Sequence, residues 1–276
     1  NLDLYLFENG YPRTTGYANF LVAASTSGNQ GSFYPPVSDE YILVKGGPHP
    51  GSGDSIYVDP DTGEAHFRKD ANIYDIANNR ENNLLIDGIK GNTVEFWLKK
   101  DAYVADQEYF EFIVDAHVTG ATRSSANYGR LSIALATTGT VNNTGNQAFF
   151  ISYASGSNQI RTYLGSNSLT TGTIADGNWH HYAVRMRNSG SNTVFDLFFD
   201  GKHNATTTST SVNIGYVSGT IEATVGAQAT SFYDGTSDRG GTGWSPFSGS
   251  IDEFRYWKRW RTSKQIQTRW FDQVGG

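Results

Sequence analysis

The sequence predicts an all-β protein built from antiparallel strands, and its clearest signal lies in residues 179–202. Two runs there alternate between apolar and polar positions, which is typical of strands with one face toward a core. Residues 188–192 hold no core-forming side chain and are expected to form a five-residue hairpin loop. Asp200-Gly201 ends the second run with a pair that favours a type I′ turn. The core positions expected from the pattern are Tyr182, Val184, Phe195, Leu197 and Phe254.

Composition supports the same class of fold. The 276 residues include 16 Tyr, 16 Phe and 31 Gly, which suits strands joined by turns. The absence of Cys favours a bacterial, phage or intracellular origin over a disulfide-bonded animal module. A net charge of −6, with 17% charged residues, gives no sign of a nucleic-acid surface. No apolar run approaches the length of a membrane span.

Taken in order, the chain begins with an expected extension at residues 1–54, an extra strand or arm packed on the domain. A hairpin follows around residues 59–63, where Pro and Gly suit a bulged turn. Residues 228–245 form a long polar loop before the closing strand, and Thr262 to Gln265 have the spacing of a capping box that begins a helix. The intervening strands are expected at 93–99, 109–118, 131–136, 148–153 and 159–164. In the second of these, Phe110, Phe112 and Val114 are expected to face the core.

Four pieces of the sequence resemble the laminin-G-like, concanavalin A-like jelly-roll family, and they occur in the family's order. They are Thr93–Lys99, Asp176-Gly-x-Trp-His-His-x-Ala-Val184, Leu197-x-x-Asp-Gly-Lys202 and Phe247–Tyr256 with Arg261–Ile266. The resemblance implies an antiparallel β-sandwich of the concanavalin A-like jelly-roll type, with an N-terminal extension and a short C-terminal helix. The laminin-G-like domain is then residues 55–276. The closing stretch is similar to domains of bacteriophage structural proteins, which favours a virion or extracellular surface location.

The first functional alternative is an enzyme, because some members of this fold are glucanases. The glucanases of the family carry two carboxylates in an E-x-D-x-x-E strand, a pattern that does not occur here. The nearest arrangement is Glu111 and Asp115 on one face of a strand, about 13 Å apart along it. Glycoside hydrolysis needs carboxylates about 5–9.5 Å apart. We therefore expect a protein that is not an enzyme.

No cofactor is expected. His180 and His181 are adjacent and face opposite sides of a strand, so they cannot chelate one metal. Calcium is the open alternative, because family members bind it through loop carboxylates, and Asp234 and Asp238 are the candidates. Turn formation, with Arg239 paired to either carboxylate, is the favoured explanation of that loop.

Glycan binding by such a fold uses aromatic faces together with polar side chains for hydroxyl groups. The longest loop holds both kinds of side chain, and loops carry variable recognition surfaces. The candidate carbohydrate-binding residues are Tyr233, Asp234, Asp238, Arg239 and Trp244.

The C-terminal stretch from Trp257 to Phe271 holds five basic residues and no acidic ones. Contacts to a nucleic acid are one interpretation. A structural role is favoured, with Tyr256 and Trp260 on the inner face and the basic side chains paired with acidic residues of the same domain or of a neighbouring subunit. We expect a non-catalytic surface or virion module that binds glycans within a larger assembly, and a homo-oligomer. The alternatives are a purely structural capsid- or tail-associated oligomer and, last, a glycoside hydrolase.

Overall fold

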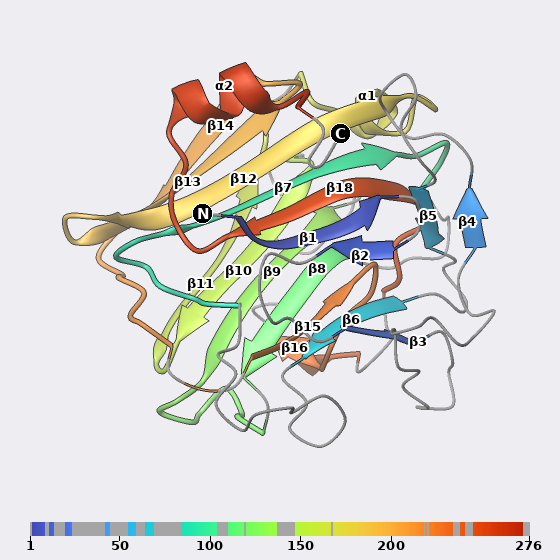
Figure 1. The fold of residues 1–276 in the computed structure, drawn as a ribbon. Coiled ribbons are helices and arrows are strands. Elements are labelled where there is room, and N and C mark those ends of the chain that lie inside the picture. The colour runs from blue at the N-terminus through green and yellow to red at the C-terminus, as the bar shows by residue number, and fades with distance from the viewer. Residues whose placement is uncertain are drawn as a thin grey trace.

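The computed structural model describes residues 84–103, 110–118, 120–136, 147–166, 168–217, 219, 221–233, 238–240 and 245–272, together with the backbone of six strands between residues 2 and 68. It is an antiparallel β-sandwich of two large sheets (Figure 1). The nine-stranded sheet contains β1 (Leu2–Glu8), β2 (Tyr11–Arg13), β4 (Ile42–Val44), β5 (Ser55–Val58), β7 (Asn92–Lys99), β12 (Trp179–Ser189), β13 (Asn192–Phe199), β14 (Lys202–Ser209) and β18 (Gly249–Trp257). The seven-stranded sheet contains β3 (Phe20–Ala23), β6 (Glu64–Arg68), β8 (Phe110–Val118), β9 (Gly129–Ala136), β10 (Phe149–Ser155), β11 (Asn158–Leu164) and β15 (Ile221–Val225). A small hairpin, β16 (Phe232–Tyr233) with β17 (Asp238–Arg239), and two helices, α1 (Thr171–Ile174) and α2 (Ser263–Arg269), complete the described elements.

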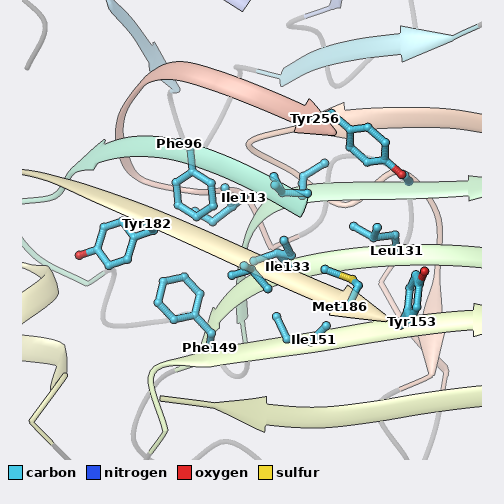
Figure 2. Close-up of a cluster of buried hydrophobic side chains, with 14 of the residues drawn as sticks. Phe96, Ile113, Leu131, Ile133, Phe149, Ile151, Tyr153, Tyr182, Met186 and Tyr256 are labelled. Carbon is cyan, nitrogen blue, oxygen red and sulfur yellow. The ribbon is translucent and has the colours of Figure 1, made fainter. Parts of the chain in front are cut away.

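The inner faces of the two sheets meet in one apolar cluster, which Figure 2 shows in part. The five core positions expected from alternation are confirmed, since each has no exposed surface and belongs to this cluster. Phe96 of β7 and Phe149 of β10 approach the ring of Tyr182 from the two sheets, at centroid distances of 5.7 and 5.3 Å. Burial of a large apolar side chain contributes about 1.5–3 kcal/mol. The closing of the two layers therefore supplies most of the stability.

The turns around β13 correct one expectation and confirm another. Strand β12 runs to Ser189 and pairs with Asn192, so the loop between β12 and β13 has two residues instead of five. Asn188 is used to bind the neighbouring loop: its side-chain amide donates to the carbonyl of Ile214 at 2.8 Å. At the other end of β13, Asp200 and Gly201 have φ of +46° and +72°, the left-handed values that a type I′ turn requires.

Strand β8 contains a β-bulge that the alternation does not reveal. Phe112 pairs with Ala134 and Val114 with Ile133, which leaves Ile113 as an extra residue. Before the bulge, Phe110 and Phe112 point to the outer face and form a second cluster with Phe150. The expectation that these two phenylalanines face the core is wrong, because the extra residue reverses the alternation; Val114 does lie in the core.

The ends of the chain add to the nine-stranded sheet. Strand β1 pairs with β18, and the division into residues 1–54 and 55–276 remains a prediction. The helix α2 begins where the capping box places it: the Thr262 hydroxyl accepts from the Gln265 amide, and the Gln265 side chain accepts from the Thr262 amide. Its Ile266 is buried against Ala183 and Phe198, so α2 covers part of the outer face of the nine-stranded sheet (Figure 1).

Candidate functional site

The candidate site is the closed loop that joins β15 to β18. The loop is closed at its base, where the Phe247 amide donates to the Gly226 carbonyl at 2.6 Å. Within it, β16 and β17 pair with Tyr233 opposite Asp238. The hairpin was not expected from the sequence, where the region reads as a polar loop. It places two of the predicted glycan-binding residues side by side at the end of a small two-stranded unit.

A buried ion pair on β8 and β9 fixes the first part of the loop. Arg130 donates to the Asp115 carboxylate from Nε at 2.9 Å and from Nη2 at 2.5 Å. The second carboxylate oxygen also accepts from the amide of Ala229 at 2.8 Å. Arg130 in turn donates to the carbonyls of Thr230 and Ser231, at 3.0 and 2.7 Å. Burial disfavours the charge on Arg130, but Asp115 and Tyr128 together outweigh this effect and raise the pKa of the guanidinium.

A second buried pair fixes the other end. Lys100 donates to Glu111 at 2.5 Å and to the carbonyl of Ser248 at 2.7 Å, and the Ser248 amide donates to Glu111 at 3.0 Å. Burial lowers the pKa of Lys100, although Glu111 opposes that shift. Glu111 lies opposite Leu135 before the bulge, and Asp115 lies opposite Ser132 after it. The expectation that these carboxylates share one face is therefore wrong: the bulge turns them to opposite faces, and each holds one end of the loop.

The hairpin rests on two arginines from neighbouring segments. The guanidinium of Arg123 lies 3.7 Å from the ring centroid of Tyr233, and that of Arg161 lies 4.9 Å away. Gln159 donates to the Arg123 carbonyl at 2.8 Å, which ties the β8–β9 loop to β11. Tyr233 is half-buried, whereas Arg123 and Asp238 are exposed. The described part of the site therefore offers guanidinium and carboxylate groups to hydroxyls, while an arginine covers the tyrosine ring.

The structure describes the remaining predicted site residues only in part. Asp234, Trp244 and the side chain of Arg239 lie outside the described residues, so their roles stay predictions. Among the residues that the structure describes, no group of three or more His, Asp or Glu side chains is arranged to hold a metal ion. The same residues include no helix long and apolar enough to cross a membrane.

His180 and His181 face opposite sides of β12, as expected. His180 lies between two carboxylates, with Nδ1 2.8 Å from Asp200 and Nε2 3.2 Å from Asp176. Burial works against the protonated ring, but the two carboxylates prevail and raise the pKa of His180. A hydrogen bond from Asn178 is the main cause that lowers the pKa of Asp176 to about 2. His181 is buried, 5.7 Å from the ring centroid of Trp97.

The C-terminal stretch is bound to the outer face of the nine-stranded sheet. Arg261 pairs with the buried Glu95 at 2.5 Å. The alternation places Glu95 on the same strand face as Trp97, but it does not indicate which cation Glu95 meets. Tyr256 lies in the core, as expected. Trp260 does not: the guanidinium groups of Arg185 and Arg187 lie 4.1 and 4.4 Å from its ring, because the chain has left the strand by then.

The fold and this loop define a lectin-like β-sandwich. Residues 75–267 match the laminin-G model described as the concanavalin A-like lectin/glucanases superfamily, and this span is more than half of the chain. The chain therefore belongs to this family. No curated protein matches the sequence.

Solved structures with a similar fold are distant in sequence. One is the binding domain of botulinum neurotoxin serotype G, with a TM-score of 0.47, 9% identity, and coverage of 90% of this chain and 49% of that chain. Another is the heptameric SAP-like pentraxin of Limulus polyphemus, with a TM-score of 0.39, 10% identity, and coverage of 91% and 81%. A third is the CBM40 of the Ruminococcus gnavus IT-sialidase, with a TM-score of 0.40, 12% identity, and coverage of 66% and 83%.

Proposed function

We propose that this domain is a non-catalytic glycan-recognition module of a larger extracellular or virion assembly, and that it contacts saccharides through the β16–β17 hairpin. The observation that carries the proposal is the double anchoring of the loop. Buried ion pairs are costly to form and contribute little net stability, so their presence at both ends suits a loop whose shape must be fixed. A fixed loop binds with less loss of conformational entropy than a mobile one.

The polar groups of the hairpin support a saccharide ligand. Arg123 supplies several N–H donors and Asp238 supplies acceptors, which together match the donors and acceptors of sugar hydroxyls. The predicted partners Asp234, Arg239 and Trp244 belong to the same loop and would extend the surface.

Three buried carboxylates are each paired with a cationic side chain, which supports a role without catalysis. General acid and base catalysis by a glycosidase needs two carboxyl groups facing one bond. Each of these three carboxylates holds a cationic side chain instead, in the pairs Glu95–Arg261, Glu111–Lys100 and Asp115–Arg130.

A glycan array tests the proposal with the wild type, Arg123→Ala and Asp238→Ala. Each substitution is expected to weaken binding about tenfold, because a hydrogen bond to a charged group contributes about 1.5–3 kcal/mol. Phe271→Ala is the matched control, since Phe271 is 54% exposed and lies on the C-terminal stretch. Wild-type levels of binding by both hairpin variants would contradict the hairpin as the site.

Further measurements on the wild type distinguish the other candidate functions. A wild type that binds no glycan but forms an oligomer of defined mass supports the purely structural role. Shorter products in mass spectra of incubated glycans would show an enzyme. The surface location is supported by the resemblance of the C-terminal stretch to domains of phage structural proteins. Immunogold labelling confined to the cell interior would contradict it.

A further inference from the structure

A second surface lies at one end of the sandwich. We call it the Tyr216 rim, and its members are Ile89, Lys90, Arg187, Tyr216 and Arg259. Four segments distant in sequence form it. Residue 87 pairs with Tyr216, and the amide of Asn188 at the end of β12 donates to the Gly88 carbonyl at 2.7 Å. The Trp260 amide donates to the Lys90 carbonyl at 2.9 Å and brings Arg259 to the same place.

The backbone of this rim is fixed by hydrogen bonds. The Asp87 carboxylate accepts from the amides of Ile89 and Lys90, at 2.8 and 3.2 Å. A Cβ atom at Gly88 would lie 2.1 Å from the Ile214 carbonyl oxygen, so the close approach of the two loops requires glycine there. The turn therefore presents its side chains from a rigid support.

Two large apolar side chains of the rim are open to solvent. Tyr216 is 61% exposed and Ile89 is 77% exposed. Phe271 is the third exposed large hydrophobic residue in the described part of the chain. An exposed aromatic ring and an exposed aliphatic side chain on linked, rigid segments can contact a ligand.

The segments of the rim also carry three exposed cations, Lys90, Arg187 and Arg259. Among the residues that the structure describes, no carboxylate lies within ion-pair distance of Lys90, Arg187 or Arg259. The Arg187 guanidinium is positioned by Trp260, at 4.4 Å from the ring. Three cations with no carboxylate partner among the described residues stand out in a chain with a net charge of −6.

We propose that the Tyr216 rim binds an anionic saccharide. Tyr216 and Ile89 contact the apolar face of a sugar ring, and the three cations pair with its carboxylate or sulfate groups. A single-stranded nucleic acid fits less well, because successive bases stack on several aromatic rings and this rim exposes one. The proposal does not depend on the hairpin, which is tested by its own substitutions, Arg123→Ala and Asp238→Ala.

Equilibrium binding to polysaccharides tests the rim. The full chain is titrated with dextran sulfate, polygalacturonate and uncharged dextran, and with poly-dT as the nucleic-acid probe. We expect binding to at least one of the anionic polysaccharides, weakened by added salt, and none to dextran. Sulfate and carboxylate are distinguished by which of the two binds more tightly.

Substitutions locate the site. Lys90→Ala combined with Arg259→Ala is expected to weaken binding about fivefold, and Tyr216→Ala by about the same factor. Both leave the Arg187–Trp260 contact in place, and circular dichroism checks that they fold. Lys202→Ala is the charge-matched control, about 17 Å along the sheet from Arg187, and Phe271→Ala is the aromatic control.

Several results would overturn the proposal. Equal affinity for dextran and dextran sulfate would show that the cations do not contribute to binding. Unchanged affinity in both rim variants, or equal losses of affinity in the two controls, would show that the binding site is not the rim. Tighter binding of poly-dT would assign the rim to nucleic acid. Loss of this binding in Arg123→Ala or Asp238→Ala, with no loss in the rim variants, would assign it to the hairpin.

Discussion

Replacement of Asp115 by alanine tests the anchoring of the loop most directly. The change leaves Arg130 buried, with 1% of its side chain exposed, and without its carboxylate. It also removes the acceptor of the Ser132 hydroxyl and of the Ala229 amide. Loss of one partner of a buried ion pair costs about 3–5 kcal/mol, because the remaining charge is uncompensated. We expect the free energy of unfolding to fall by that amount.

Urea unfolding followed by circular dichroism measures the loss, and thermal unfolding gives a second reading. For a domain of this size about 1 kcal/mol corresponds to about 2–4 °C, so the melting temperature should fall by about 6–20 °C. Asp101→Ala, at an exposed carboxylate, should change stability by less than about 0.5 kcal/mol. A loss below about 1 kcal/mol in Asp115→Ala would refute the reasoning, since the pair would then not hold a buried charge.

Two further predictions concern other parts of the fold. The pKa of His180 is raised in the folded protein, so its stabilising contribution is complete below pH 6.5 and is lost as the pH rises through the folded-state pKa. The pKa of Asp176 is lowered to about 2, so its stabilising contribution is present above pH 3.8 and is lost as the pH falls toward 2. Asp176→Asn should therefore lower the pKa of His180 in an NMR titration, and an unchanged value would contradict the pairing. Gly201→Ala should destabilise the protein by more than Gly190→Ala, because both have positive φ but only the Cβ at position 201 would meet a side chain, at 2.2 Å from Trp270. Equal losses of unfolding free energy in urea would show that the contact is unimportant.

The sequence predicts the faces of the central strands because one side chain in two must leave water. Tyr182 and Leu197 show no exposed surface, as alternation requires. The turn at Asp200-Gly201 and the cap at Thr262 are predictable for a similar reason: each depends on a few neighbouring residues whose backbone preferences are strong.

The ion pairs of the site could not be predicted, because their partners are distant in the chain. Asp115 and Arg130 are separated by 15 residues, and Glu95 and Arg261 by 166. No local pattern indicates which of the 21 basic residues a given carboxylate meets. Tyr216 was missed for a related reason, since the exposure of one aromatic residue depends on what the other loops leave uncovered.

The bulge in β8 connects the fold to the proposed function. In a regular strand, residues 111 and 115 would share a face, and both carboxylates would lie on the same side of the sheet. The extra Ile113 reverses the alternation, so that Glu111 points inward to Lys100 and Asp115 points outward to Arg130. One strand can then hold a loop that begins on the outer face of the sheet and returns to its interior. The extra residue in β8 therefore places the two carboxylates on opposite faces of the sheet, where each can anchor one end of the loop.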